Sequence, residues 1–319
     1  MNCLYCGKPL NHEIPEEFQQ RWHTKCIRSF FGTDTLPVLD ISNRTLEDLA
    51  MHAVNGGAAV PGVQKKLSLH LSKESVPKLT IVNHPNDYIL KPSESRYPYI
   101  TELEHLTMSM AQAVGIQTVK HGLIPLNNGL ACITRREDRE LDEKDSFRLR
   151  AMEDFAQLSN RISADKYKGS YEQAAKVIEK FSHFPVLDKS RFFQLLVFCF
   201  ITGNSDMHLK NFSLIENRPG SHLYSLAPAY DLLPVNLVLP EDTEMTALTL
   251  HGKKKNQRKN DFLYLADNMG LPRPTALRII QNLCRQEHRF FSLIDQSELP
   301  ETWQQKFKHL IHDRINRLS

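Results

Sequence analysis

The sequence predicts an α+β protein with two lobes, a strand-rich N-terminal half followed by a helical C-terminal half. From about residue 54 to 135, short apolar runs alternate in the manner of strands, and after about residue 145 the apolar spacing becomes helical. With 41% hydrophobic and 24% charged residues among 319, the composition is that of an ordinary globular chain. We therefore expect three parts: a Cys/His-rich segment over 1–30, an N-terminal lobe over 31–145 and a helical lobe over 146–319.

Charge and hydropathy argue against several functional classes. A net charge of +3 is too small to indicate nucleic-acid binding. No apolar run approaches the length of a membrane-spanning helix, and the start of the chain lacks a basic-then-apolar signal pattern. We expect a cytoplasmic protein that binds neither membrane nor DNA directly.

The N-terminal lobe should contain several short strands and one helix. The helix is predicted over residues 100–114, where apolar residues recur at helical spacing before Gly115, a natural C-cap. Strands are predicted near residues 62–71 and 88–90, and a hairpin over 119–126 and 130–134 with its turn at 127–129.

The C-terminal lobe should be built around one buried helix. Residues 192–202 are almost wholly apolar, which indicates a helix surrounded by protein. Further helices are predicted over 261–269, 274–292 and 301–318, with prolines at the gaps between them.

One segment after the buried helix carries a chemical pattern. Asp206 is followed five residues later by Asn211, and Asp231 comes twenty residues after that. Protein kinases use such a set, in which one Asp takes the substrate hydroxyl proton while an Asn and a later Asp ligate the magnesium of ATP. The alternative is that the first two residues form turns and Asp231 caps a helix.

The N-terminal half supplies matching parts. The small residues of 56–62 could let backbone N–H groups approach phosphates, although a glycine pair alone is merely a loop. Lys91 ends a predicted strand, and Glu102 and Glu104 lie on the helix that follows. A kinase needs a strand Lys paired with a helix Glu, whereas the alternative is a solvated strand end.

At this point the sequence resembles the HipA family of bacterial toxin kinases, over roughly residues 54–318. The likeness rests on six blocks in the right order: residues 62–67, 89–92, 104–105, 134–139, 203–212 and 226–231.

The resemblance implies a protein-kinase-like, HipA-like fold with an α/β N-terminal lobe and an all-α C-terminal lobe. It implies that Asp206 is the catalytic base and that Asn211 and Asp231 are the magnesium ligands. It also implies ATP contacts beyond these, from Gly62, Val63, Gln64, Lys66, Lys91, Glu104, His208 and the adenine-facing backbone from Arg135 to Glu137.

The resemblance further implies a Ser/Thr kinase toxin of a toxin–antitoxin system. Substrates in the family are aminoacyl-tRNA synthetases, whose phosphorylation blocks charging and arrests growth, and the cognate partner is a DNA-binding, HipB-like antitoxin. This chain is short for the family and is similar to HipT, the kinase of split three-component systems. That similarity implies a small, HipS-like partner protein.

The chain departs from the family at the loop before the glycine of the Gly-x-Gln block. The family usually carries a serine there whose autophosphorylation ejects the loop, but here the positions are Ala59, Val60 and Pro61. Either this member lacks that self-inhibition, or the serine has been replaced to keep the loop in place. No catalytic group is lost in either case.

The first thirty residues contain a candidate zinc site. Cys3 and Cys6 form one pair and His23 and Cys26 another, a set that suits tetrahedral zinc. The alternative is a group of buried thiols and a surface His without metal. The other cysteines stand singly in apolar surroundings, so we expect a reduced chain.

Two alternatives to an active protein kinase stay open, an ATP-binding pseudokinase and a small-molecule kinase. A zinc-dependent nucleic-acid module is disfavoured by the low net charge. The basic run at Lys253–Lys255, Arg258 and Lys259 is read as a solvated loop, with docking on an anionic partner as its alternative.

Overall fold

The protein is described from a computed structural model that covers residues 1–40, 66–73, 75–81, 86–126, 129–141 and 147–319. The chain forms two compact units. The first comprises residues 1–105 and 119–136, and the second comprises residues 106–118 and 137–319. Helix α4 (Ile100–Ala113) contributes to both, because the boundary falls after His105.

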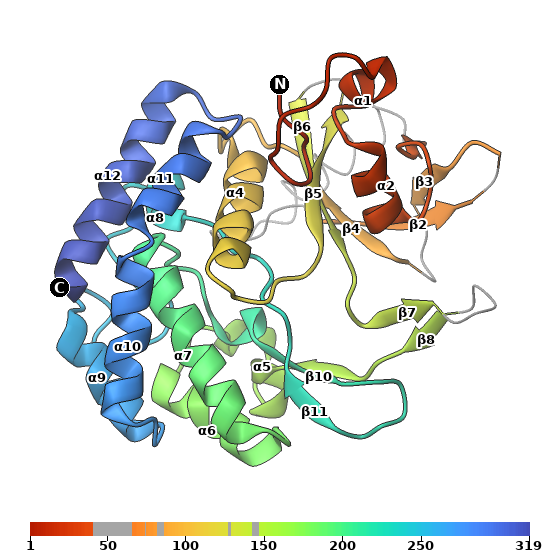
Figure 1. Ribbon diagram of the computed structural model, residues 1–319. Helices are drawn as coiled ribbons and strands as arrows, with labels where there is room; N and C mark the ends of the chain where they lie inside the picture. The colour runs from red at the N-terminus through yellow and green to blue at the C-terminus, as the bar shows by residue number, and fades with distance from the viewer. Residues whose placement is uncertain (41–65, 74, 82–85, 127–128, 142–146) are drawn as a thin grey trace. The chain divides into compact units, whose positions relative to one another are not determined.

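The first unit is built on a six-stranded sheet with the order β1-β3-β2-β4-β6-β5 (Figure 1). Strand β1 pairs parallel with β3, and the other pairs are antiparallel. The strands are β1 (Val38–Leu39), β2 (Leu67–Ser72), β3 (Lys78–Ile81), β4 (Tyr88–Lys91), β5 (His121–Leu126) and β6 (Gly129–Arg135). The predicted strand at 88–90, the hairpin and the helix over 100–114 are all present.

Alternation along the strands separates the two faces of this sheet. In β2 the residues Leu67, Leu69 and Leu71 are buried while those between them are partly exposed. Leu90 pairs with Leu67 and joins the same apolar cluster. Since successive side chains point to opposite faces, Lys91 projects from the other face of β4.

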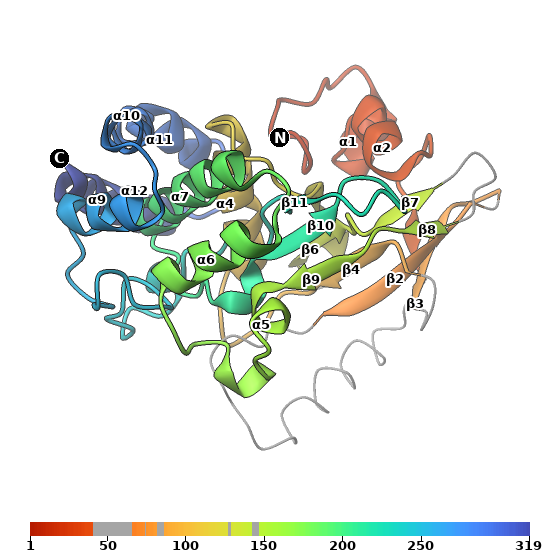
Figure 2. The ribbon, with the colours of Figure 1, turned by 90° about the horizontal axis from the view of Figure 1, so that it is seen from below.

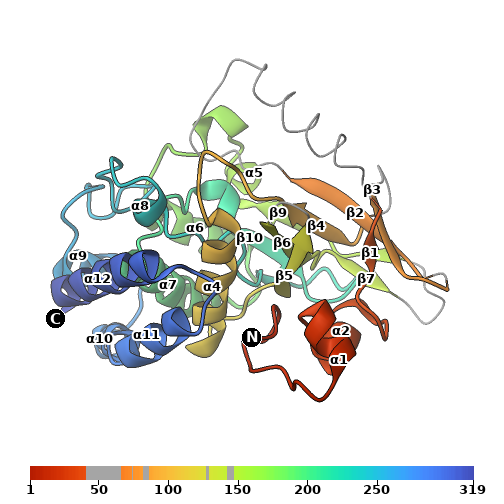
Figure 3. The same ribbon diagram turned by 90° about the horizontal axis from the view of Figure 1, so that it is seen from above.

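The apolar face is covered by the N-terminal segment, which contains α1 (Pro15–Gln20) and α2 (Thr24–Phe31). Figure 3 shows both helices next to each other in this segment. Trp22 and Phe30 are fully buried, and the Trp22 indole N–H donates to the Leu123 carbonyl at 2.9 Å. The backbone N–H of Leu123 in turn donates to the Leu4 carbonyl at 2.9 Å. The segment is therefore part of the core of the first unit.

The second unit is mainly helical and is organised around α7 (Pro185–Ile201). Phe192, Phe193, Phe198 and Phe200 on α7 are almost inaccessible to solvent, as the apolar run predicts. Helices α6, α10 and α12 pack against α7, and Figure 3 shows α10, α11 and α12 gathered beside it. The other described helices of the second unit are α5 (Phe155–Leu158), α6 (Tyr171–Phe181), α8 (Val235–Val238), α9 (Lys259–Asn268), α10 (Arg273–Cys284), α11 (Glu287–Asp295) and α12 (Glu301–Leu318).

One predicted helix proves to be two. The prediction of a single helix over 274–292 is wrong, because α10 ends at Cys284 and α11 begins at Glu287. The buried positions Ile280, Leu283 and Phe290 keep helical spacing across the break, so periodicity could not show it. At the break, the Gln286 N–H donates to the Leu283 carbonyl at 3.0 Å and tightens the turn.

The helical unit also contains short strands, which the expectation of an all-α lobe left out. Strands β9 (Met152–Asp154), β10 (Ser213–Glu216) and β11 (Tyr224–Leu226) form an antiparallel sheet with β10 in the middle (Figure 2). Strands β7 (Arg139–Leu141) and β8 (Phe147–Leu149) form a separate pair. These strands of three or four residues are too short for alternation to reveal them. Among the residues that the structure describes, no helix has both the length and the apolar character needed to cross a bilayer.

Candidate functional site

The loop that carries Asp206 begins where α7 must end. Gly203 has φ +70°, a conformation that L side chains rarely adopt, and it follows the C-cap residue Thr202. A Cβ at Gly203 would lie 2.6 Å from Leu310 Cδ2, so the Leu310 side chain of α12 would have to shift. Glycine is favoured here by the positive φ of the turn and by the close packing of α12.

Asp206 lies partly buried in this loop beside Tyr167. The Tyr167 hydroxyl donates to Asp206 Oδ1 at 2.6 Å. Burial raises the pKa of Asp206 to about 6, and the negative charge of Asp231 adds to the rise, while the bond from Tyr167 opposes it. A carboxyl group with this pKa is mostly ionised at pH 7 yet can accept a proton, as a general base must.

Asn211 is fixed to the backbone of the same loop. Its Nδ2 donates to the Asp206 carbonyl at 2.9 Å, and its backbone N–H donates to the His208 carbonyl at 2.9 Å. The loop closes with the 3₁₀ turn η2 (Leu209–Asn211). Because the amide nitrogen makes this bond, the side-chain oxygen is the atom that a cation could use.

Asp231 follows the β10–β11 pair, which lies between it and Asn211 in the chain. Its φ of +58° is uncommon for any residue except glycine, and Asp is among the few that tolerate it. The preceding Tyr230 anchors the segment, since its hydroxyl lies 2.6 Å from Ser213 Oγ and donates to the Lys210 carbonyl at 3.2 Å. Such a conformation held by its surroundings is typical of functional sites. Asp231 caps no helix, because α8 begins after Pro234.

Side chains from later segments of the chain hold the loop that carries Asp206 in position. Ser205 Oγ donates to Asp242 Oδ2 at 2.8 Å, and Asn236 Nδ2 lies 3.3 Å from the same Ser205 oxygen. Arg314 of α12 donates to Asn236 Oδ1 at 2.7 Å. The loop is therefore tied to the two segments that follow it in the chain.

His208 and Tyr167 lie together next to Asp206. His208 is buried, and its ring meets the Tyr167 ring edge-to-face with 5.0 Å between centroids. Sequence reasoning included His208 but missed Tyr167, which lies 39 residues before Asp206. A lone tyrosine in a polar stretch gives no signal in a single sequence, so only the fold could find it.

The first unit holds a buried ion pair between Lys91 and Glu104. Lys91 Nζ lies 2.5 Å from Glu104 Oε1, and both residues are buried. Of the two candidate partners on the helix, Glu102 instead accepts a hydrogen bond from Thr101. Lys91 is the last residue of β4, as the sequence predicts.

The remaining predicted nucleotide contacts are placed only in part. Gly62, Val63 and Gln64 lie outside the described residues, as do Gly56–Pro61 with the position of the missing serine. Lys66 is exposed just before β2. Arg135 ends β6, and its N–H donates to the Lys120 carbonyl at 2.9 Å. The chain passes from the first unit to the second between Arg136 and Glu137.

The four N-terminal candidates for a metal site lie together. The ligand atoms of Cys3, Cys6, His23 and Cys26 are all within 4.8 Å of one another. Within the part of the chain that the structure describes, no disulfide joins any of the cysteines. Cys132 and Cys199 are buried, whereas Cys284 is partly exposed.

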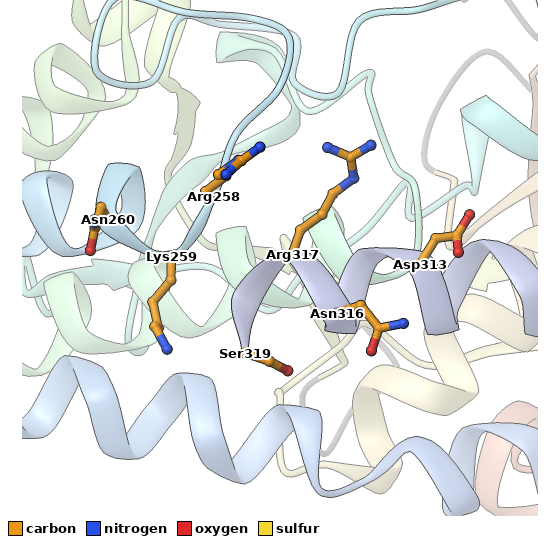
Figure 4. A pocket seen from close by; sticks show the side chains of 7 residues that line it. All are labelled: Arg258, Lys259, Asn260, Asp313, Asn316, Arg317 and Ser319. Atoms are coloured by element: carbon orange, nitrogen blue, oxygen red, sulfur yellow. The ribbon is translucent and has the colours of Figure 1, made fainter.

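Side chains of the basic run form ion pairs, which a fully solvated loop would not show. Lys253 Nζ lies 2.8 Å from Asp261 Oδ1, and Lys254 Nζ lies 3.2 Å from Glu244 Oε2. Arg258 and Lys259 line a surface hollow of about 540 Å³ with Arg317 of α12 (Figure 4). This hollow includes none of the three residues Asp206, Asn211 and Asp231.

Comparison with solved structures identifies the fold. A HipA from Shewanella oneidensis, solved with HipB and operator DNA, matches with a TM-score of 0.70 at 19% identity over 85% of this chain and 70% of that one. The Helicobacter pylori proinflammatory kinase CtkA matches with a TM-score of 0.54 at 16% identity, over 75% and 90% of the two chains. The protein therefore has a kinase-like fold with a helical C-terminal part. It belongs to the HipA-like C-terminal domain family, whose match covers residues 58–289.

Curated relatives agree with this assignment. A Haemophilus influenzae protein named "Putative kinase" is 27% identical over 270 residues, 77% of each chain. Two Sinorhizobium fredii proteins, "Putative kinase Y4mE" and "Putative kinase Y4dM", are 26% and 29% identical over 70% and 65% of this chain. The chain spans about half the length of these last two, 54% and 53%.

Proposed function

We propose that this protein is an ATP- and magnesium-dependent Ser/Thr protein kinase. The observation that carries the proposal is the arrangement around Asp206 in the second unit. There a carboxyl group of raised pKa, an amide fixed to its backbone and a second carboxylate share one small region. Membership of the HipA-like family and the names of the relatives support a kinase.

The chemistry of the site fits a magnesium ion. Asn211 offers an amide oxygen and Asp231 a carboxylate, the hard oxygen ligands that magnesium prefers. The charge of Asp231 also raises the pKa of Asp206, a repulsion that a cation would relieve. Asn211 and Asp231 would hold the ion, which supplies positive charge to the phosphates of the nucleotide.

Asp206 acts as the base. It accepts the proton of the substrate hydroxyl while that oxygen bonds to the γ-phosphorus and the bond to the β-phosphate oxygen breaks. Tyr167 orients the carboxylate through Oδ1 and leaves Oδ2 for the substrate. Lys91, positioned by Glu104, binds phosphate oxygens. We assign further nucleotide contacts to Gly62, Val63, Gln64, Lys66, His208 and the backbone of Arg135–Glu137.

We assign the kinase to a toxin–antitoxin system of the cytoplasm. The solved HipA relative is bound to HipB and operator DNA, which supports an antitoxin partner for this chain. The resemblance to HipA supports a serine of an aminoacyl-tRNA synthetase as target. It likewise supports a small HipS-like protein as a further partner of the HipT-like short form. In this proposal residues 31–145 bind phosphate and residues 146–319 carry the catalysis.

Transfer of labelled phosphate from ATP to a panel of aminoacyl-tRNA synthetases, each with and without its tRNA, tests the proposal. We expect label on one synthetase, with loss of at least a hundredfold in Asp206→Asn and in Asp231→Asn. Asn217→Asp, at the residue after β10, serves as a matched control because the Asn217 side chain bonds to Ser225 instead of to the three site residues. Substantial activity in Asp206→Asn would refute the assigned base. Nucleotide binding without transfer to any synthetase would point to a pseudokinase or to a kinase whose substrate lies outside this family's habit.

A further inference from the structure

The N-terminal segment brings four metal-binding side chains together. Cys3 and Cys26 are buried, and Cys6 and His23 are partly exposed. Cys3 and Cys6 belong to a tight turn in which the Gly7 N–H donates to the Cys3 carbonyl at 2.9 Å. His23 is the N-cap residue of α2, and Cys26 lies in the first turn of that helix. Two separate backbone turns thus present two ligands each.

The distances between these side chains fit a tetrahedral ion. Zn–S and Zn–N bonds of about 2.3 and 2.0 Å at tetrahedral angles give an S···N edge of roughly 3.6 Å. Cys6 Sγ lies 3.4 Å from His23 Nδ1, and Cys26 Sγ lies 3.8 Å from the same nitrogen. Nδ1 therefore lies at the expected separation from both sulfurs.

The other ring nitrogen of His23 also has a suitable partner. Nε2 lies 3.1 Å from the carbonyl oxygen of Pro9, which can only accept a hydrogen bond. The tautomer with its proton on Nε2 satisfies this carbonyl, and in that tautomer the lone pair of Nδ1 faces the sulfurs. Metal-bound histidines in proteins are typically oriented by such a bond from the second nitrogen.

Backbone N–H groups point toward the sulfur of Cys3. The His23 N–H donates to Cys3 Sγ at 3.4 Å, and the Tyr5 and Cys6 N–H groups are further donors. These donors favour the thiolate, the form of cysteine that binds metal, and act against the hydrogen bond with Cys6 and the burial, which raise the pKa of Cys3 in the metal-free chain. They also join the first turn to the second, since His23 lies 20 residues from Cys3.

We propose that Cys3, Cys6, His23 and Cys26 bind one structural Zn²⁺ ion. Three thiolates and one imidazole complete a tetrahedron, so the ion has no open position for catalysis. Soft sulfur ligands at this geometry select zinc over the magnesium of a phosphate site. The ion takes no part in the proposed phosphoryl transfer, so its test does not require kinase activity.

The ion would fasten the N-terminal segment to the sheet of the first unit. The residues beside the ligands, Leu4, Trp22 and Ile27, belong to the apolar cluster that includes Leu90 of β4. Tyr88 of β4 has its hydroxyl 3.3 Å from the Phe30 carbonyl of α2. Zinc therefore stabilises the strand that ends in Lys91, on the face opposite to that residue.

Metal analysis of the full-length protein, purified reduced and without chelator, provides the test. We expect one zinc per chain in the wild type and less than a tenth of that in Cys6→Ser and in His23→Ala. The matched controls are Cys284→Ser, a partly exposed thiol in the second unit, and His12→Ala, an exposed histidine that lies between the two ligand pairs in the sequence. Both should retain the full zinc content.

A spectroscopic readout keeps the proposal testable if the ligand variants fold poorly. Cobalt added to zinc-depleted wild type should give the visible bands of a tetrahedral thiolate site, and zinc should abolish them. Depletion should also shift Trp22 emission to the red, measured in a Trp303→Phe background that leaves Trp22 as the only tryptophan. A folded, reduced wild type without zinc that yields no such cobalt spectrum would overturn the proposal. A disulfide among these cysteines in the freshly purified protein, or equal zinc loss in Cys284→Ser, would do the same.

Discussion

Replacing Tyr167 by phenylalanine should move the pH dependence of the kinase instead of abolishing its activity. The substitution keeps the ring against His208 but removes the hydroxyl that donates to Asp206 Oδ1 at 2.6 Å. A hydrogen bond to a charged group contributes about 1.5–3 kcal/mol, and one pKa unit corresponds to about 1.4 kcal/mol. The pKa of Asp206, about 6 in the wild type, should rise by roughly 1–2 units.

The expected loss follows from the ionised fraction of Asp206. With a pKa of about 6, roughly nine-tenths of the carboxyl groups are ionised at pH 7, and with a pKa near 7.5 roughly a quarter are. Phosphoryl transfer should therefore fall about fourfold at pH 7 and recover by about pH 9. Since an acid must lose its proton to act as base, activity rises with pH in both proteins and the variant curve lies at higher pH.

Single-turnover rates measured from pH 5.5 to 9.5, at one magnesium concentration, provide the assay. In the proposed mechanism magnesium would offset the charge of Asp231 in both proteins, so the displacement between the two curves is the quantity to compare. Tyr171→Phe is the matched control, because its hydroxyl donates to the Met207 carbonyl instead of to Asp206. An unchanged midpoint with a lower plateau at every pH would refute the role given to Tyr167.

Three further predictions concern stability, each measured by urea unfolding. Lys91→Met should lower the free energy of unfolding by about 3–5 kcal/mol, because it removes the ammonium group that pairs with the buried Glu104 carboxylate. The double variant Lys91→Met/Glu104→Gln should recover part of this loss. Gly203→Ala should lower the free energy of unfolding by about 1–3 kcal/mol, because of the φ of +70° and the contact of the new Cβ with Leu310. Adding Leu310→Ala should relieve the contact but not the backbone strain. The third prediction concerns His105 and the buried His121, whose Nδ1 atoms lie 2.9 Å apart. Burial lowers the pKa of His105 to about 4, so the unfolded chain takes up protons first and stability should fall between pH 6.5 and 4, on the order of 3 kcal/mol. His105→Gln should flatten this slope, and an unchanged slope would contradict the assignment.

Periodicity predicted the elements that are long or sharply bounded. The helix over 100–114 matches α4, and the apolar run from 192 matches the second half of α7. The break at 285–286 escaped prediction because the buried positions on both sides stay in phase. The short strands β9–β11 escaped because they are too short to show alternation, and β9 is a strand only through its pairing with β10, about sixty residues further along the chain.

For the candidate site, the order of residues in the sequence predicted which of them share a loop. It could not predict partners that lie far away in the sequence. The spacing of Asp206 and Asn211 predicted that they share one loop. The hydrogen bond from the Asn211 side-chain amide to the Asp206 carbonyl follows from that spacing. Tyr167 and Asp242 could not be predicted, because they reach the loop from residues 39 positions before Asp206 and 37 positions after Ser205. The roles given to the catalytic and nucleotide-binding residues stay predictions that the experiments above address.

The docking of the N-terminal segment has a consequence for the order of folding. Trp22 and Leu4 bond to Leu123, about a hundred residues downstream. During synthesis the first thirty residues cannot pack against the sheet until β5 has left the ribosome. Contacts of such long sequence separation are slow to form, and the exposed aromatic residues of the waiting segment are open to aggregation. A chain interrupted before residue 123 would therefore present this apolar surface to the cell, so expression yield should depend strongly on chaperone supply.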